Sequence, residues 1–332
     1  MRRQMVQPGR VEFRVRCAQR MVAAHVSAEQ ADLFDIVGTK MLAKRLAHRM
    51  GAGRQAPPPM SLALDHRHPP PASWRPSWFL QATFACHAAA LVLAWWQPLW
   101  ALGLLLANHG LIVAATLWPR SQWFGPNLVR LPDAAARRGE VAITIDDGPE
   151  PTVTPRVLDL LDAAGARASF FCIADRVAAH PELAREIIAR GHEIQNHTAS
   201  HRHNFSLLGP RGYAAELSRA QQLIESVTGQ KPRCFRAPAG FRNPFIAPVL
   251  ARQGLTLVSW TRRGFDTREG NAERVLQRLV RGLRAGDILL LHDGHAATSA
   301  DGEPVVLQVL PRLLARCGAA GLKPVRLGEA LA

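Results

Sequence analysis

The sequence predicts an α/β protein, a distorted (β/α) barrel of about seven parallel strands that follows an α-helical transmembrane hairpin. Two observations support this fold class. Through residues 139–332, short β-branched runs alternate with amphipathic segments, which is typical of a parallel sheet covered by helices. Ahead of them, residues 78–118 contain no Lys, Arg, Asp or Glu.

The strands are predicted from seven short runs in residues 139–332. They cover 141–145, 168–173, 193–196, 234–237, 256–260, 288–291 and 324–327. Amphipathic helices are predicted over 181–190, 211–227, 272–284 and 304–320. About seven strands in about 190 residues favour a barrel or distorted barrel over an open sheet. In that architecture the active groups gather at the carboxyl ends of the strands.

The composition of the 332 residues excludes several classes of protein. Lys+Arg 41 against Asp+Glu 26 gives a net charge of +15, but the basic residues are almost all Arg and no run interleaves them with aromatics. We therefore expect no nucleic-acid partner. A basic protein that binds a membrane surface or nucleic acid is an alternative that rests on charge alone. The five cysteines are scattered without a CxxC pair, so neither a disulfide framework nor a thiolate zinc site is indicated.

Residues 1–73 are predicted to be a basic, poorly structured N-terminal segment. Residues 1–60 hold eleven basic against four acidic side chains, a net 11 − 4 = +7, and no apolar run long enough for an export signal. Met60 is an alternative start, because three prolines directly before it end any helix.

A two-helix transmembrane hairpin is predicted over residues 74–120. Glutamine and proline at 97–98 divide the uncharged stretch into 78–96 and 99–118, each close to the about 20 residues that span a bilayer. Tryptophans cluster at the ends of both pieces, as at membrane interfaces. We expect residues 78–118 to contact membrane lipids. A buried hairpin of a soluble protein is the alternative, since polar residues such as Asn108 and His109 interrupt the stretch.

The charges that flank the hairpin predict its orientation. Arg67 and Arg75 precede it, Arg120 and Arg130 follow it, and the turn between the helices is uncharged. The positive-inside rule then places both ends in the cytoplasm. We expect a multi-pass protein of the inner (cytoplasmic) membrane, with a linker over 121–138 and the domain 139–332 on the cytoplasmic face.

Two acidic and two imidazole side chains follow predicted strands. Asp146 and Asp147 come directly after the first strand, and adjacent carboxylates repel one another unless a cation is present. His197 and His201 follow the third strand and are spaced to converge on one metal ion, for which a carboxylate completes a His₂Asp site. Helix capping by the aspartates is the alternative, and His203 is a rival ligand whose spacing points it elsewhere.

Two further strand ends carry polar groups. Arg236 ends a predicted strand, where its guanidinium could orient a carboxylate through two hydrogen bonds. Pro and Gly in the following Ala237-Pro238-Ala239-Gly240 give the backbone an unusual path, so that N–H groups there could face an oxyanion. A structural salt bridge of Arg236 is the alternative. His292 ends another strand, where it could act as a general acid.

These motifs, taken in order, resemble the polysaccharide deacetylases, the NodB-homology domain of carbohydrate esterase family 4. The motifs are Thr144-Ile-Asp-Asp-Gly-Pro149, His197-Thr-Ala-Ser-His201, Arg236-Ala-Pro-Ala-Gly240, residues 260–266 and Leu290-Leu-His292. The resemblance implies that 139–332 is a catalytic domain and that the chain is a membrane-anchored member. It implies a hydrolase of non-peptide carbon–nitrogen bonds that removes an N-acyl group, acetyl or formyl, from a sugar in a polysaccharide or lipid-linked glycan.

The resemblance also implies a role for each motif residue. These are Asp147, His197 and His201 as metal ligands, Asp146 as the catalytic base held ionised by Arg236, His292 as the acid positioned by Asp266, and the backbone N–H of Ala239 at the oxyanion. Two imidazoles and one carboxylate favour Zn²⁺, with Co²⁺, Ni²⁺ and Mn²⁺ as alternatives.

The chain departs from the family pattern where substrate is recognised. Ala239 replaces the usual aromatic residue, and the usual paired-aspartate element ending in Trp reads Arg263, Asp266, Thr267. Residues 239–242 are similar to the branch that deformylates lipid-linked aminoarabinose, so the expected partner is an N-acylated sugar or glycan, lipid-linked on this reading. The alternative function is a catalytically silent, membrane-anchored carbohydrate-binding or scaffold protein.

Overall fold

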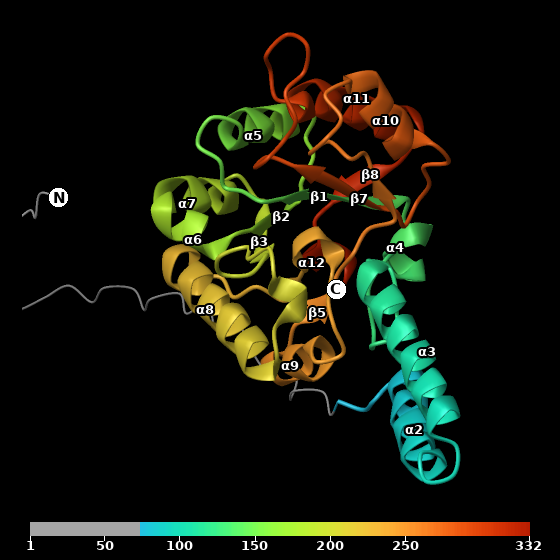
Figure 1. Cartoon of the computed structure of the whole chain (residues 1–332). Helices are drawn as coiled ribbons and strands as arrows, with labels where there is room; N and C mark the ends of the chain where they lie inside the picture. Colours follow the sequence, from blue (N-terminus) through green and yellow to red (C-terminus); the bar gives the residue numbers. More distant parts are fainter. Residues whose placement is uncertain (1–73) are drawn as a thin grey trace, which may run out of the picture. The chain divides into compact units, whose positions relative to one another are not determined.

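The computed structural model describes residues 74–332. It contains a helical hairpin followed by an α/β domain (Figure 1). The predictions for residues 1–73, including the alternative start at Met60, lie outside the described residues.

The described chain alternates helices and strands along most of its length. The helices are α2 Trp78–Leu93, α3 Pro98–Leu117, α4 Asp133–Arg137, α5 Thr154–Ala163, α6 Ala174–Ala179, α7 Pro181–Ala189, α8 Pro210–Thr228, α9 Ile246–Gln253, α10 Ala272–Val280, α11 Val305–Ala319 and α12 Leu327–Ala330, with 3₁₀ turns η1 Phe205–Leu207 and η2 Pro238–Gly240. The strands are β1 Glu140–Asp146, β2 Ser169–Cys172, β3 Glu193–Asn196, β4 Cys234–Phe235, β5 Thr256–Leu257, β6 Arg262–Arg263, β7 Ile288–His292 and β8 Lys323–Val325.

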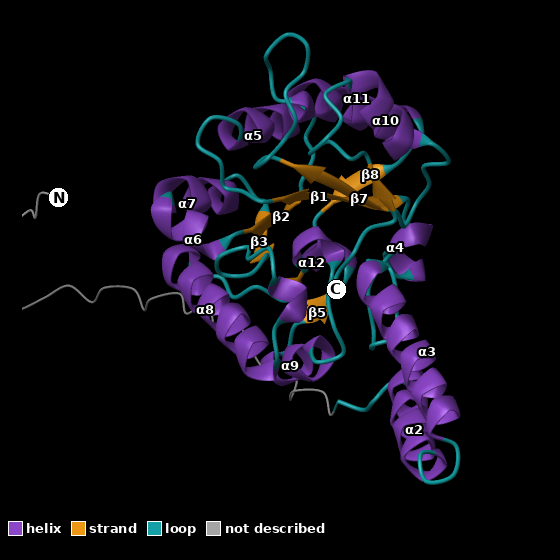
Figure 2. Ribbon diagram, viewed as in Figure 1, coloured by secondary structure: helices purple, strands orange, loops and turns teal. Residues whose placement is uncertain are grey.

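The strands form one curled parallel sheet with helices on its outer side (Figure 2). The order is β5-β4-β3-β2-β1-β7-β6, and β8 pairs with the first residues of β1. Every ladder is parallel, and no ladder joins β5 to β6 among the described strands. The sheet is therefore an incomplete, distorted barrel, which confirms the predicted fold class.

The structure corrects several predicted element bounds. The strand predicted over 256–260 ends at Leu257, because the Ser259 N–H bonds to the Leu128 carbonyl at 2.9 Å outside the ladder. The strand predicted over 324–327 ends at Val325, where the chain turns into α12. Strand β6 and helices α4, α5, α6, α9 and α12 were not predicted. The two arginines of β6 carry no apolar alternation that would mark a strand.

Side-chain alternation along β1 separates the core from the site. Val141, Ile143 and Ile145 pack into the apolar cluster between the sheet and the outer helices. The residues between them face the barrel interior, as a period of two requires. Ala142 joins an interior apolar cluster there, and Asp146 reaches the carboxyl end of the strand.

An apolar cluster fills part of the barrel interior. It contains Ala142, Phe171 and Ile288 together with Leu327 and Ala330 of α12. This packing leaves the carboxyl ends of the strands for polar groups. There, Asp146 of β1 lies in register with His292 of β7.

Residues 121–138, predicted as a linker, pack against the barrel. The Leu128 N–H bonds to the Leu257 carbonyl at 2.9 Å, and the Leu131 N–H bonds to the Gly286 carbonyl at 2.8 Å. Arg130 pairs with the buried Asp287 at 2.5 Å. The segment therefore forms part of the α/β domain.

The two helices before this segment pack against each other as a hairpin. The Ser77 side chain caps α2 by accepting from the Leu80 N–H at 3.3 Å, and Pro98 begins α3. Between the helices, Thr83 donates to Asn108 at 3.3 Å. Helix α3, with 20 residues, is long and apolar enough to cross a membrane, whereas α2 has 16 residues.

Candidate active site

The predicted site residues meet at the carboxyl end of the barrel, around a cavity of about 380 Å³. The cavity wall includes Asp146, Asp147, His197, His201, Ala239 and His292. Arg236 and Asp266 lie behind this wall and are buried. The structure thus brings all eight predicted site residues into one region, although they come from five separate segments of the chain.

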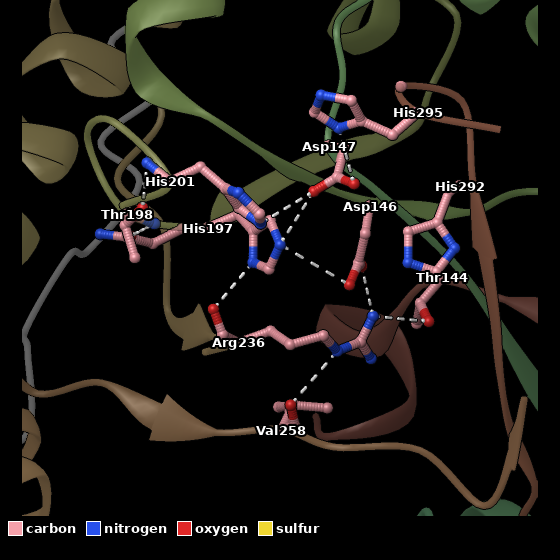
Figure 3. A network of polar contacts seen from close by, with 12 residues as sticks. Thr144, Asp146, Asp147, His197, Thr198, His201, Arg236, Val258, His292 and His295 are labelled. Atoms are coloured by element: carbon pink, nitrogen blue, oxygen red, sulfur yellow. Dashed lines mark hydrogen bonds and ion pairs between the residues drawn. The ribbon is translucent and has the colours of Figure 1, made fainter. Parts of the chain in front are cut away.

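Asp147 and the two histidines converge within this cavity (Figure 3). Asp147 adopts a left-handed backbone with φ of 76°, which turns its side chain out of the strand direction. Its Oδ1 atom lies 3.2 Å from Nε2 of His197 and 3.2 Å from Nε2 of His201. The three ligand atoms lie within 4.8 Å of one another.

His197 is oriented by a main-chain carbonyl. Its Nδ1 atom lies 2.8 Å from the carbonyl oxygen of Arg236, so Nδ1 carries the proton that it donates there. Its Nε2 lone pair is then available on the side of Asp147. Such a carbonyl partner is common behind a metal-binding imidazole, because it sets the tautomer and the ring orientation.

His201 is positioned by the loop after β3. The Thr198 N–H bonds to the Asn196 side chain at 2.9 Å, and the Thr198 hydroxyl accepts from the His201 N–H at 2.9 Å. Asn196 is itself held by Gln221 of α8 at 3.0 Å. The two histidines therefore meet on a tight loop with positive φ at Thr198 and His201.

These three side chains have the chemistry of a cation site. Asp147 Oδ1 is buried and has no hydrogen-bond partner, although two imidazoles face it. Burial would raise the pKa of Asp147, but the neighbouring imidazoles of His197 and His295 hold it well below its usual range. Burial lowers the pKa of His201 to about 4, which leaves that imidazole neutral at pH 7, as metal binding requires. The residues present therefore fit a divalent metal ion.

Asp146 pairs with Arg236 in the barrel interior. Arg236 donates to Asp146 Oδ1 at 2.5 Å and to the Thr144 hydroxyl at 2.9 Å. Its guanidinium lies 4.0 Å over the Phe171 ring and also donates to the Ser259 carbonyl at 2.9 Å. Asp146 Oδ2 faces the site, 3.9 Å from Nε2 of His197.

His292 is held by Asp266 through both of its carboxylate oxygens. Asp266 accepts from the His292 N–H at 2.7 Å and lies 2.9 Å from its Nδ1. Burial would lower the pKa of His292, but the Asp266 charge and hydrogen bond raise it to about 9. The ring is therefore protonated at pH 7 and can donate a proton.

The loop at η2 also contributes to the cavity wall. Ala239 has φ of 52° and is exposed, while Gly240 has φ of 78°. A Cβ at Gly240 would lie 2.5 Å from Cβ of Pro119 and 2.8 Å from the Trp260 ring. Only glycine fits here, so the loop that carries Ala239 is closely packed on its far side.

His295 belongs to the site but was not predicted. Its Nδ1 lies 3.2 Å from Asp147 Oδ2, and Arg176 approaches its Nε2 at 3.2 Å. Its position three residues after His292 was the available signal. His203, the rival ligand, lies at the exposed rim of the cavity and is absent from the cluster of ligand atoms.

Comparisons with known proteins agree with this geometry. A family model described as polysaccharide deacetylase matches residues 133–258. The chain is 38% identical over 156 residues to a chitooligosaccharide deacetylase of Bradyrhizobium sp. (strain ANU 289), covering 47% of this chain and 71% of that relative. It is 36% identical over 164 residues to a peptidoglycan-N-acetylglucosamine deacetylase of Bacillus cereus, covering 46% and 72%.

A solved structure is similar as well. It is the family 4 carbohydrate esterase from Streptomyces lividans in complex with acetate, with 32% identity and a TM-score of 0.51. The alignment covers 56% of this chain and 91% of that one.

The fold and the site define a hydrolase of carbon–nitrogen bonds other than peptide bonds. The chain belongs to the polysaccharide deacetylase family, whose members remove acetyl groups from sugars.

We predict that replacing His197 abolishes metal binding while replacing His203 does not. Equilibrium dialysis against Zn²⁺ should give one ion per wild-type chain, no bound ion for His197→Ala and one ion for His203→Ala, since His197 faces Asp147 and His203 does not. Equal retention of zinc by both variants would contradict the assigned ligand set.

We predict that Asp266→Asn moves the alkaline limb of the pH–rate profile. His292 must be protonated to act as an acid, so activity should fall as the pH rises through about 9. Without the Asp266 charge the pKa of His292 falls, and the limb should move down by about 1–3 pH units. The limb should stay in place in the exposed control Asp301→Asn. An unmoved limb in Asp266→Asn would show that another group supplies the proton.

Proposed function

We propose that this protein is a metal-dependent deacylase that removes an N-acyl group from a sugar, with Asp146 as base and His292 as acid. The observation that carries the proposal is the meeting of three elements at one cavity. These are the Asp147, His197 and His201 cluster, the Asp146–Arg236 pair and the His292–Asp266 pair.

The ligand residues define where the cation would act. Asp147, His197 and His201 would hold a divalent ion, and zinc is the first choice because its usual protein ligands are imidazole and carboxylate. When bound, the ion would lower the pKa of a water molecule and polarise the acyl carbonyl.

Asp146 is suited to accept the proton of the attacking water. Arg236 holds Oδ1, so the carboxylate cannot rotate freely, and Oδ2 faces the ligand cluster near His197. The base is thereby fixed in orientation beside the place where the water would lie. General-base catalysis of this kind contributes about 10²–10⁴ in rate.

His292 is suited to protonate the departing amine. Its Nδ1 is engaged by Asp266, which leaves Nε2 for the substrate. The backbone N–H of Ala239, on the exposed loop at the cavity wall, would stabilise the developing oxyanion.

Acetyl is the acyl group favoured by the relatives, and formyl is the alternative raised by residues 239–242. A lipid-linked glycan is the substrate class that we propose, because the same chain carries an apolar hairpin. A substrate that stays in the membrane would be met by an enzyme that is anchored there.

The surface of the hairpin supports membrane insertion. Most of the exposed large apolar side chains of the described residues lie on α2, α3 and their connection, with Trp95 85%, Leu99 82% and Leu91 78% exposed. An apolar surface of this extent is unusual on a monomeric soluble protein. We propose that residues 78–118 lie in the inner membrane, with the catalytic domain on the cytoplasmic face.

We predict that Asp146→Asn lowers turnover by a factor of about 10²–10⁴. The variant should still bind one metal ion, since Asp146 is placed as the base and not as a ligand. Acetate and formate release from N-acylated glycans measures turnover, and dialysis measures metal. Asp301→Asn, at an exposed position outside the cavity, serves as the control. Full activity in Asp146→Asn would overturn the assigned base. Wild-type protein that binds metal but turns over no substrate would favour the catalytically silent alternative.

We predict opposite activities for reporters fused on the two sides of α3, in the hairpin turn before it and at the end of the domain that follows it. Positive charge flanks both ends of the hairpin, which predicts that Ala332 lies in the cytoplasm. Green fluorescent protein fused after Ala332 should therefore fluoresce, and alkaline phosphatase fused there should be inactive. The same reporters fused after Trp96, in the hairpin turn, should give the reverse pattern. Active phosphatase at Ala332 would place the domain outside and make a periplasmic glycan the leading substrate.

A further inference from the structure

Arg263 is a cationic side chain on the cavity wall that the mechanism does not use. It belongs to β6 and lies in register with Leu290 of β7, which also lines the cavity. Thr267 and Arg268 continue the same wall. The chain therefore places a guanidinium beside the reaction centre.

The neighbouring residue fixes the direction of Arg263. The Arg262 side chain bonds to Asp287 and to the main-chain carbonyls of Arg281 and Gly282. Successive strand residues point to opposite faces, so anchoring Arg262 on that side turns Arg263 toward the cavity.

Arg263 has no partner in the described part of the chain. Its Nε is buried without a hydrogen-bond acceptor, and no ion pair engages its guanidinium. The rings of Trp260 and Phe265 lie near it, at 5.2 and 5.1 Å from ring centroid to guanidinium carbon. Burial lowers its pKa, as expected for a charge that has lost water without gaining a direct counterion.

The nearby carboxylates are already engaged elsewhere. Asp266 holds His292, and Asp146 pairs with Arg236 at 2.5 Å. Arg263 is half-buried, and a cation that loses part of its hydration without gaining a hydrogen-bond acceptor is costly unless an anion or a water meets it. The second arginine of this wall, Arg268, adds positive charge to the same side of the cavity.

We propose that Arg263 forms an anion subsite that binds a carboxylate or phosphate group carried by the substrate next to the acylated sugar. This inference rests on the proposed deacylase function, whose substrate class it narrows. A guanidinium can hold either anion with two parallel hydrogen bonds, and the adjacent aromatic rings limit its motion. With a neutral substrate, only water would be left to accept from the guanidinium.

Three probes test the subsite by turnover: neutral chitotetraose, a hyaluronan tetrasaccharide with carboxylates, and UDP-N-acetylglucosamine with phosphates. The wild-type enzyme should prefer one anionic probe, and the ratio of its kcat/KM to that of chitotetraose should fall tenfold or more in Arg263→Gln. Arg263→Lys should keep part of the preference. Arg281→Gln, an exposed arginine outside the cavity, should leave the ratio unchanged. The preferred probe tells carboxylate from phosphate.

Binding to the Asp146→Asn variant separates this inference from the proposed function. In Asp146→Asn with Arg263 intact, dialysis should show tighter binding of an anionic probe than of chitotetraose. This difference in affinity should be lost when Arg263→Gln is added to the same variant. That result without any wild-type turnover would support the anion subsite and overturn the deacylase proposal. Turnover of chitotetraose with no anionic preference, or an equal ratio in Arg263→Gln and wild type, would overturn the subsite and leave the deacylase proposal standing.

Discussion

The site depends on one buried residue, Arg236, which contacts both the proposed base and one of the proposed metal ligands. Its guanidinium holds Asp146 at 2.5 Å, and its own carbonyl oxygen orients His197 at 2.8 Å. Removing one partner of a buried ion pair costs about 3–5 kcal/mol, because the other charge is left without compensation. The base and the ligand cluster are therefore held by the same residue, and a shift of Arg236 would disturb both.

A second chain of contacts links the hairpin to this residue. The carbonyl oxygen of Pro119, just after α3, accepts hydrogen bonds from Asn127 at 3.0 Å, Arg242 at 2.9 Å and Ser259 at 2.7 Å. The carbonyl of Ser259 in turn accepts from Arg236. The end of α3 is thus bound to the strand end and to the loop at η2. The hairpin and the cavity wall are therefore joined through the Pro119 carbonyl.

Much of the barrel could be predicted because strand periodicity is local. The alternation in β1 and the apolar run of β7 were visible in the sequence, and so were the polar groups that follow them. Asp146, Asp147, His197, Arg236 and His292 were found for the same reason, since each lies at or just after the end of a predicted strand, whereas Asp266 was assigned only through the family resemblance. Strand β6 was missed because its two arginines owe their extended backbone to pairing with β7 and to Asp287, neither of which is local.

The sequence by itself determined the fold class, the apolar hairpin and the residues at the strand ends, because a period of two or 3.6 residues is written in neighbouring positions. Only the tertiary structure decided which of these residues meet. Arg236 reaches Asp146 across 90 positions, and Asp147 meets His295 across 148. The unpartnered state of Arg263 was equally invisible, since a side chain is left without a counterion only when the surrounding carboxylates have folded against other groups.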